Sequence, residues 1–408
     1  VEATDLFENH VNLSWTPGAD VTHITYANAN DAENIQTINL TAEEKAAGKY
    51  TLAGLQPTST YTITIYKNDV KRGQLQITTP AANYKYSLSS DVTVISQTLI
   101  DEIAEQAKAA AGNETNYSAT IGIPAGAKVA LYGTNDTDGG KTNVTIPDGM
   151  SVTFFGLAGG ETPTITLDKN FDVAGSHAFI KFQNVKLEEN GAGYFINQSK
   201  ACTVGEFTLE DCEVSNIKTS FFRFQGSDAK SVGKLTLKNS IFTNLCAGYG
   251  FIHIDAKNGA GHLDNVEIDG CTFNSICVTG KVFIYSNKKD MQDITIKNST
   301  FYNCNGNGQY FVDFGKDAKF GPNTFTIESC IFGKSADEKT DKNIRSKTPA
   351  TVANSFRTTD FFKVIKGVID TEFSSEQLFT DPANGNFTIK AGTLKEKAGD
   401  PRWYVVED

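Results

Sequence analysis

Five segments repeat one pattern: GEFTLEDCEVSN (205–216), GKLTLKNSIFTN (233–244), DNVEIDGCTFNS (264–275), QDITIKNSTFYN (292–303) and NTFTIESCIFGK (323–334). In each, an alternating strand ends in Leu or Ile, a polar corner and one small residue follow, and a second short strand carries Val or Phe. The small residue falls at Cys212, Ser240, Cys271, Ser299 and Cys330, in steps of 28, 31, 28 and 31 residues. A repeat of this length, with strands of period two and no helical pattern, predicts a parallel β-solenoid.

A third strand separates successive repeats: GYFINQ (193–198), FFRFQG (221–226), GFIHID (250–255), VFIYSN (282–287) and YFVDFG (310–315). Because successive side chains of a strand point to opposite faces, alternation divides each segment into two sets. We expect the mostly apolar set to point inward: Phe222, Phe224, Ile252, Ile254, Phe283, Tyr285, Val312 and Phe314. The mixed set is then expected on the outer face: Phe221, Arg223, Gln225, Phe251, His253, Asp255, Val282, Ile284, Ser286, Phe311 and Asp313.

The seven cysteines do not read as a disulfide or metal framework. Cys212, Cys271 and Cys330 are two coils apart, about 10 Å at the usual strand spacing, which is beyond disulfide reach. We expect them to be free thiols that act as small apolar side chains inside the stack. Cys246 and Cys277 occupy equivalent positions in adjacent coils and can approach each other. Since no CxxC spacing is present, no metal site is predicted.

The corner residues that precede the small-residue column form a column of their own, comprising Asp211, Asn239, Gly270, Asn298 and Ser329. Amide and carboxylate side chains in such a column can bond the turns above and below. We interpret these residues as structural.

Residues 1–80 differ from the rest of the chain. VNLSWTP (11–17), THITYAN (22–28), YTLAGLQPTSTYTITIYKN (50–68) and GQLQITTP (73–80) read as strands of a sandwich. Trp15 on the second strand, the spacing of Leu55, Pro57 and Tyr61, and the Thr-rich last strand together resemble a fibronectin type III domain. The resemblance implies that the Tyr61 hydroxyl bonds back to the preceding turn, and that the module spaces or presents its neighbour. TAEEKAAG (41–48) reads as an inserted helical turn.

One convincing helix is predicted at SQTLIDEIAEQAKAAAG (96–112), with Ser96 or Thr98 as its cap and Gly112 as its stop. The first coil of a solenoid exposes strand edges and apolar core, so we expect this helix to cover that end. The predicted fold is all-β, with a sandwich at 1–80, a linker and capping helix at 81–118, and a parallel β-helix at 119–408.

Two further segments lie in the predicted β-helix. Asp136 and Asp138 in GTNDTDGGKTN (133–143) faintly resemble a calcium loop, but the later acidic ligand is missing, which favours a surface turn. The end, LFTDPANGNFTIKAGT (378–393) and AGDPRW (398–403), resembles the closing coil of pectin-lyase-like right-handed β-helix proteins, in particular uncharacterised surface proteins of Bacteroidetes that carry a fibronectin-like module.

The resemblance implies where a ligand would bind. In that superfamily a sugar polymer usually lies in a groove along the outer face of the third strand. The same location in this sequence would place the groove at Phe221, Arg223, Phe251, His253, Asp255, Phe311 and Asp313, with Tyr194, Tyr249 and Tyr310 beside it. Aromatic faces can stack on sugar rings, and Arg, His and Asp can supply directional hydrogen bonds. Packing of these aromatics under loops is the alternative interpretation.

Catalysis is less well supported. A hydrolase needs paired carboxylates about 5 to 9 Å apart, whereas Asp255 and Asp313 are roughly 10 Å apart by alignment, and the usual Asp-Asp and Gly-His-Gly signatures are absent. A lyase needs a base and often calcium or another cation; Arg223 and His253 on adjacent coils are the best available pair. If the protein is an enzyme, a polysaccharide lyase is favoured over a hydrolase. No cofactor is otherwise expected.

Composition and charge exclude some classes of function. The formal net charge is -11 and Lys and Arg do not cluster, which argues against nucleic-acid binding. The sequence also has no run of about 18 apolar residues, so no membrane span is predicted. A first residue other than Met suggests a removed export signal or lipid anchor, so we expect the protein at the cell surface or in the periplasm. We also expect it to be a monomer. Three functions stay open: polysaccharide binding without catalysis, a polysaccharide lyase or hydrolase, and a stalk or adhesin that binds protein.

Overall fold

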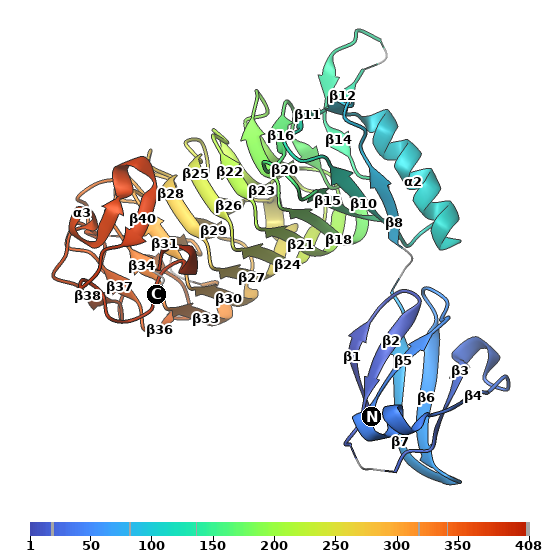
Figure 1. The fold of residues 1–408 in the computed structure, drawn as a ribbon. Helices are drawn as coiled ribbons and strands as arrows, with labels where there is room; N and C mark the ends of the chain where they lie inside the picture. The colour runs from blue at the N-terminus through green and yellow to red at the C-terminus, as the bar shows by residue number, and fades with distance from the viewer. Residues whose placement is uncertain (18–19, 81–82, 136, 317–318, 341, 405–408) are drawn as a thin grey trace. The chain divides into compact units, whose positions relative to one another are not determined.

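The computed structural model describes residues 1–408 except 18–19, 81–82, 136, 317–318, 341 and 405–408. The chain divides into two compact units, one of residues 1–84 with 104–119 and the other of residues 85–103 with 120–408. Apart from the strands at 83–87 and 117–123, which the division crosses, every sheet of the described residues belongs to one unit (Figure 1).

The N-terminal unit contains two antiparallel sheets around one core. One sheet has the order β1 (Glu2–Leu6), β2 (His10–Ser14), β5 (Lys49–Ala53), and the other β4 (Gln36–Asn39), β3 (His23–Asn28), β6 (Thr60–Lys67), β7 (Val70–Thr78). Alternate residues from both sheets, among them Leu13, Ile24 and Ile63, bury against each other. The expected Tyr61 contact is confirmed, because its hydroxyl accepts a hydrogen bond from the Gln56 N–H at 2.9 Å.

The predicted helical turn in this unit is α1 (Ala42–Ala47). Thr41 caps it by accepting from the Glu44 N–H, and the Glu44 side chain accepts from the Thr41 N–H, a capping box that satisfies two free donors. Gly48 ends the helix in the left-handed conformation. A 3-10 turn, η1 (Ala29–Asp31), follows β3.

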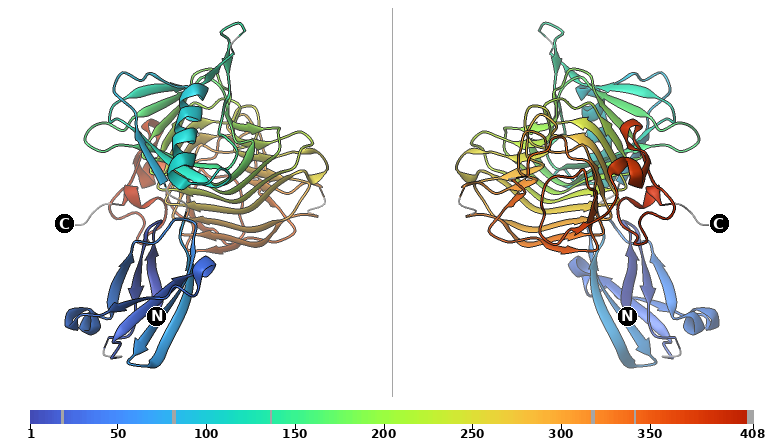
Figure 2. Two further views of the ribbon diagram at one scale, coloured as in Figure 1. Left: turned by 90° about the vertical axis from the view of Figure 1, so that its right-hand side faces the viewer. Right: turned by 90° about the vertical axis from the view of Figure 1, so that its left-hand side faces the viewer.

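The second unit is a parallel β-solenoid, which confirms the fold predicted from the repeat. The coils stack so that three parallel sheets run the length of the stack (Figures 1 and 2). The ten-stranded sheet comprises, in order, β36 (Thr351–Ala353), β33 (Pro322–Glu328), β30 (Met291–Lys297), β27 (Gly261–Asp269), β24 (Lys230–Lys238), β21 (Cys202–Glu210), β18 (Gly175–Gln183), β15 (Met150–Gly156), β10 (Tyr117–Ile123) and β8 (Asn83–Ser87).

The other two sheets continue the same coils. The eleven-stranded sheet comprises β38 (Ile369–Asp370), β37 (Phe356–Arg357), β34 (Ile331–Phe332), β31 (Thr300–Tyr302), β28 (Thr272–Ile276), β25 (Ile241–Leu245), β22 (Glu213–Ser215), β19 (Lys186–Glu189), β16 (Thr164–Leu167), β11 (Lys128–Leu131) and β9 (Val94–Ile95). The eight-stranded sheet comprises β14 (Val144–Thr145), β17 (Phe171–Asp172), β20 (Tyr194–Gln198), β23 (Ser220–Phe224), β26 (Ile252–Ile254), β29 (Ile284–Ser286), β32 (Val312–Asp313) and β35 (Ile344–Arg345).

The remaining elements interrupt or close the coils. They are the hairpin β12 (Gly133–Thr134) and β13 (Lys141–Thr142), η2 (Lys257–Gly259), α3 (Ser375–Leu378), the hairpin β39 (Phe379–Asp381) and β40 (Asn386–Ile389), η4 (Pro382–Asn384) and η5 (Pro401–Trp403). The predicted helix is α2 (Gln97–Ala111), with Ser96 accepting from the Leu99 N–H. Within the solenoid unit, Ile100 and Ile103 of α2 are fully buried and the Gln97 side chain bonds the backbone of Thr145. β8 and β9 show that the expected linker contributes strands to two sheets.

Two columns of phenylalanine fill the core of the coils. Phe221, Phe251 and Phe283 stack nearly parallel, at 4.7 and 4.9 Å between ring centroids, and Phe195 and Phe311 extend this column. Phe242, Phe273, Phe301 and Phe332 form the second column, which meets the first edge to face. Such offset and edge contacts add to the free energy gained by burying each ring.

The polar corners and the small-residue column both have the structural role that the sequence predicts. The corner residues have φ between 45° and 64°, the left-handed region that Asn, Asp and Gly tolerate best, at Asn184, Asp211, Asn239, Gly270, Asn298, Ser329 and Asn354. In the next column each Ser hydroxyl accepts from the Cys N–H one coil earlier, as for Cys212 and Ser240 at 3.0 Å. All seven cysteines are buried and free, and burial, together with the neighbouring Cys246, raises the pKa of Cys277.

Candidate functional site

One row of outward side chains crosses the eight-stranded sheet at a single register position. The pairs Arg223 with His253, His253 with Tyr285 and Tyr285 with Asp313 are direct partners on neighbouring strands. Asn197 extends the row before Arg223, and Arg345 extends it after Asp313. We call these six residues, together with Tyr194, Tyr249, Asp255 and Tyr310 beside them, the outer face. Neighbouring positions of the row are about 4.8 Å apart, as in any sheet.

Three aromatic residues predicted for the outer face are in the core instead. Phe221, Phe251 and Phe311 are at most 2% exposed and stack in the first phenylalanine column. The prediction was wrong because strict alternation does not hold where the chain enters the strand. Phe251 lies at a bend before β26, so Phe251 and the next residue, Ile252, both point inward.

The predicted orientation of the segment 282–287 was wrong by one residue. Ile284 pairs with Ile252 and is fully buried, and Ser286 is also buried, so Tyr285 between them points outward. Its ring stacks on His253 at 4.6 Å with an angle of 17° between the planes. The sequence contained a signal for this register, since Phe221, Phe251, Phe283 and Phe311 are each followed by an apolar residue. Asn197 and Arg345, which also belong to the outer face, were not among the predicted site residues.

The first ion pair of the outer face holds Arg223 rigidly. Its Nε and Nη2 atoms donate to the two carboxylate oxygens of Asp255 at 3.1 and 2.6 Å. The guanidinium carbon lies 3.7 Å from the ring centroid of Tyr249, and Nη1 is 3.5 Å from the Tyr194 hydroxyl. Because Arg223 is only 8% exposed, this bidentate pair is partly desolvated and its geometry is well defined.

A second ion pair repeats this arrangement farther along the stack. Arg345 donates through Nε and Nη2 to the carboxylate of Asp313, both at 2.7 Å, and its guanidinium lies 4.4 Å from the ring centroid of Tyr310. Asp313 is buried at 4% exposure. Each pair therefore joins neighbouring coils and holds a tyrosine ring beside a guanidinium group.

His253, between the two ion pairs, is a neutral hydrogen-bond donor. Its Nδ1 accepts from the Gly250 N–H at 3.2 Å, so the proton of the neutral ring is on Nε2, which lies 3.8 Å from an oxygen of Asp255. Burial lowers the pKa of His253 to about 4; the charge of Asp255 opposes this shift, and Arg223 and Lys281 add to it. The ring is therefore neutral at pH 7.

The outer face brings together most of the predicted site residues but in roles that differ from acid–base catalysis. Arg223 and His253 are adjacent, and Asp255 joins them, as the alignment predicts. Asp255 and Asp313 each receive two hydrogen bonds from a guanidinium group, so both carboxylates are already held by arginine. The arrangement can present aromatic rings and fixed polar groups to a ligand.

No cluster of three or more His, Cys, Asp or Glu side chains suited to a metal ion occurs among the described residues. In the loop that faintly resembles a calcium site, Asp136 lies outside the described residues. The Asp138 carboxylate accepts from the Gly140 N–H at 2.9 Å, as in an ordinary polar turn.

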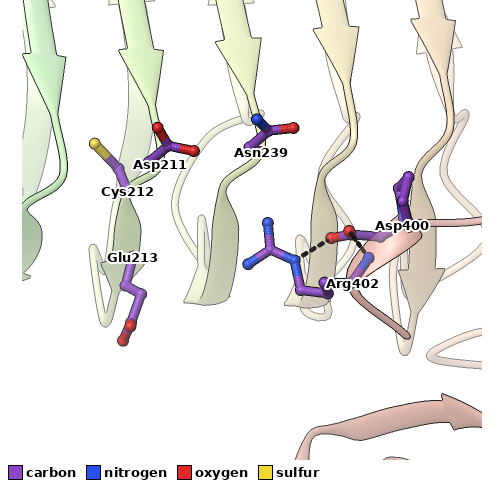
Figure 3. A pocket seen from close by; sticks show the side chains of 7 residues that line it. Asp211, Cys212, Glu213, Asn239, Asp400 and Arg402 are labelled. Atoms are coloured by element: carbon purple, nitrogen blue, oxygen red, sulfur yellow. Dashed lines mark hydrogen bonds and ion pairs between the residues drawn. The ribbon is translucent and has the colours of Figure 1, made fainter. Parts of the chain in front are cut away.

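A polar pocket of about 380 Å³ lies where the C-terminal segment meets the corner columns (Figure 3). Asp211 and Asn239 line it from neighbouring turns, and Asp400 and Arg402 line it from the segment. Asp400 is already engaged by Thr272 and Arg402, each at 2.7 Å, and burial raises its pKa. The Gly-Asp-Pro-Arg-Trp sequence (399–403) thus attaches the segment to the solenoid.

Comparison with protein families gives one match. A family described as a domain of unknown function (DUF5123) matches residues 294–403, which span the last coils and the C-terminal segment through Trp403. No curated protein matches the chain. Within the described residues, no helix is both long and apolar enough to cross a membrane.

Proposed function

We propose that the outer face binds a polysaccharide without cleaving it. The observation that carries this proposal is the in-register row from Asn197 to Arg345, in which two Arg–Asp pairs hold tyrosine rings and polar groups in place along the stack. An extended polymer that lies along the solenoid axis would meet one polar or aromatic side chain of this row at each coil.

The chemistry of the row suits sugar rings. Tyr194, Tyr249, Tyr285 and Tyr310 are partly exposed, and aromatic rings pack against the C–H faces of sugars while their hydroxyls reach water. Asn197 and the Nε2–H of His253 offer hydrogen-bonding groups between the rings. Because the ion pairs fix these side chains before a ligand arrives, little side-chain entropy is lost on binding.

Cleavage is disfavoured by the same contacts. A lyase would need a base, but the unprotonated nitrogen of His253 is already occupied by the Gly250 N–H, and Arg223 is bound to Asp255. A hydrolase would need one protonated carboxyl group, whereas both carboxylates of the face are paired with arginine. These contacts support binding over either reaction.

The proposal includes the two finer architectural assignments. The two-sheet N-terminal unit would be a fibronectin type III-like spacer, and the solenoid a pectin-lyase-like β-helix that carries the binding face. A protein that binds an external polysaccharide would be exported to the cell surface or the periplasm.

The proposal is tested with a panel of neutral and uronate-containing polysaccharides in native affinity gels. We expect retardation by at least one polysaccharide, and a loss of at least tenfold in affinity for Tyr249→Ala and for Tyr285→Ala. Tyr132→Ala, which removes a partly buried ring elsewhere on the solenoid, is the control and should bind normally. Parallel assays follow reducing ends and unsaturated uronates, and neither should be produced.

Three results would contradict the proposal. Retardation that is unchanged in both tyrosine variants would show that the face is not the binding surface. Release of reducing ends or unsaturated uronates that stops in His253→Ala would establish a hydrolase or a lyase. If no polysaccharide is retarded, the protein is better explained as a stalk or adhesin.

A further inference from the structure

A second polar pocket, of about 570 Å³, lies on the eleven-stranded sheet, which is a different side of the coil from the outer face. Its floor is the outward column Thr243, Asn274 and Tyr302, which pair in register on β25, β28 and β31. Its wall is the turn 383–385 of η4, which joins β39 to β40. Figure 1 shows this hairpin beside β28 and β31.

The fold holds this wall in place through a small apolar cluster. Phe387 of β40 packs against Tyr302 at 5.3 Å between ring centroids, and Leu378, Phe379 and Phe387 are fully or almost fully buried. Gly385 is left-handed, with φ of 83°, and a Cβ atom on it would lie 3.9 Å from the Asn274 amide nitrogen. The pocket therefore belongs to the packed structure and does not depend on an isolated loop.

Some polar groups that line this pocket bond one another or a neighbour: Ser275 donates to Asn274 Oδ1, Asn303 donates to Ser275, and Asn384 donates to Asp381. Across the described residues, no hydrogen bond or ion pair engages the Tyr302 hydroxyl, the Asn274 amide nitrogen or the Lys334 ammonium group. Tyr302 is nevertheless 92% buried, since only 8% of it is exposed. The side chains of Thr243 and Asn244 are likewise without partners in the part of the chain that the structure describes. The Tyr302 hydroxyl and the Asn274 amide nitrogen are not among the buried side-chain atoms of the described residues that lack a partner, so they are open to the pocket, where a ligand with matching groups would replace water.

The chemistry of these groups indicates an uncharged ligand rich in hydroxyls. Two hydroxyls, two amides and one ammonium group supply donors and acceptors in roughly equal measure. Burial raises the pKa of Tyr302, and the negative charges of Asp360, Glu376 and Asp381 raise it further. The same negative charges would repel an anionic sugar, although Lys334 would attract one.

We propose that this pocket binds a neutral sugar unit, with Asn274, Tyr302 and Lys334 donating hydrogen bonds to its hydroxyls. Its volume is in the range of small-molecule sites, large enough for one sugar and too small for a folded partner. The site is independent of the outer face, so it can exist whether or not the outer face binds polysaccharide.

Saturation-transfer NMR tests this proposal with glucose, galactose, mannose and xylose as probes and galacturonate as the charged comparison. The full chain is used with Tyr249→Ala and Tyr285→Ala in place, so that the outer face does not contribute. We expect saturation transfer to at least one neutral probe and weaker transfer to galacturonate. Asn274→Ala and Lys334→Ala should each weaken binding of that probe several-fold.

A matched pair of variants locates the binding. Thr243→Trp places a large ring in the pocket and should abolish saturation transfer. Ser215→Trp places the same ring at the paired position one coil earlier, outside the pocket, and should leave transfer unchanged. Thermal unfolding of both variants checks that the solenoid is intact. The proposal is overturned if no neutral probe shows transfer, if Thr243→Trp retains it, or if galacturonate binds more tightly.

Discussion

At the residue scale, Arg223 and His253 show how packing changes the meaning of a residue type. Both are adjacent and outward, as predicted. Arg223, however, is bound to Asp255 through two hydrogen bonds, and His253 has its free nitrogen occupied by a backbone N–H. Residues that looked like a catalytic pair therefore act as a rigid platform in our proposal.

The pKa of His253 leads to a prediction about stability and pH. The imidazole has a pKa of about 4 in the folded protein and about 6.5 when unfolded, so between these values the unfolded chain binds the extra proton. The stabilisation is fully present above pH 6.5 and is lost as pH falls toward 4. At about 1.4 kcal/mol per pKa unit, its upper limit is roughly 3 kcal/mol.

Chemical denaturation at pH 7 and pH 4.5 measures this effect against His253→Gln, which cannot titrate. In a Trp15→Phe background the fluorescence of Trp403 reports the solenoid unit, because the chain has two tryptophans. The free energy of unfolding should fall more steeply with acid in the parent than in His253→Gln. Equal slopes would mean that His253 is accessible to protons in the folded state.

At the scale of the elements, the corners between the ten-stranded and eleven-stranded sheets depend on left-handed residues. Seven consecutive coils place a residue with φ between 45° and 64° at this corner. An L-residue with a Cβ is strained in this region, and Asn and Asp tolerate it best after Gly. The polar column in the sequence is thus a backbone requirement as well as a source of hydrogen bonds.

Substitution at Asn239, where φ is 48°, tests this requirement. Asn239→Ala should lower the free energy of unfolding by about 1 kcal/mol, because Ala is strained in the left-handed region and cannot bond locally. Asn239→Gly should be close to neutral. The two variants remove the same side-chain groups, so denaturation curves that are equally shifted would show that the amide, and not the backbone conformation, is what matters.

At the scale of the whole molecule, the solenoid is held together by neighbours along its axis. Each parallel strand bonds the coil before and the coil after it, and the phenylalanine columns cross the same boundaries. The stability of such a stack is approximately the sum of coil and interface contributions. A substitution that destabilises a central coil should therefore also destabilise the neighbouring coils, and this effect should decrease with distance along the axis.

Phe251→Ala tests this cooperativity, because Phe251 is fully buried between Phe221 and Phe283. We expect a loss of about 3 to 5 kcal/mol in the solenoid. Hydrogen exchange should accelerate most in residues 220–300 and remain unchanged in residues 1–80, which have their own core. Phe179→Ala, on the partly exposed outer side of β18, is the control and should cost about 1 kcal/mol or less. Uniform acceleration across both units would contradict this description.

The sequence by itself determined the period, the parallel stacking, the column of polar corner residues, the buried free thiols and the position of α2. These features follow from local alternation and from the turn preferences of Asn, Asp, Ser and Gly, which can be recognised without knowledge of tertiary contacts. The adjacency of Arg223 and His253 also followed, since aligned repeats place equivalent residues on neighbouring coils.

Only the tertiary structure decided which side chains the outer face presents and what they can do. The bend before β26 turned Phe251 inward, and the pairing of Ile284 with Ile252 turned Tyr285 outward. The pocket on the eleven-stranded sheet combines residues from Thr243 to Gly385, which no local pattern could join. Orientation at a bend and contact between distant segments depend on packing, and packing is a property of the whole fold.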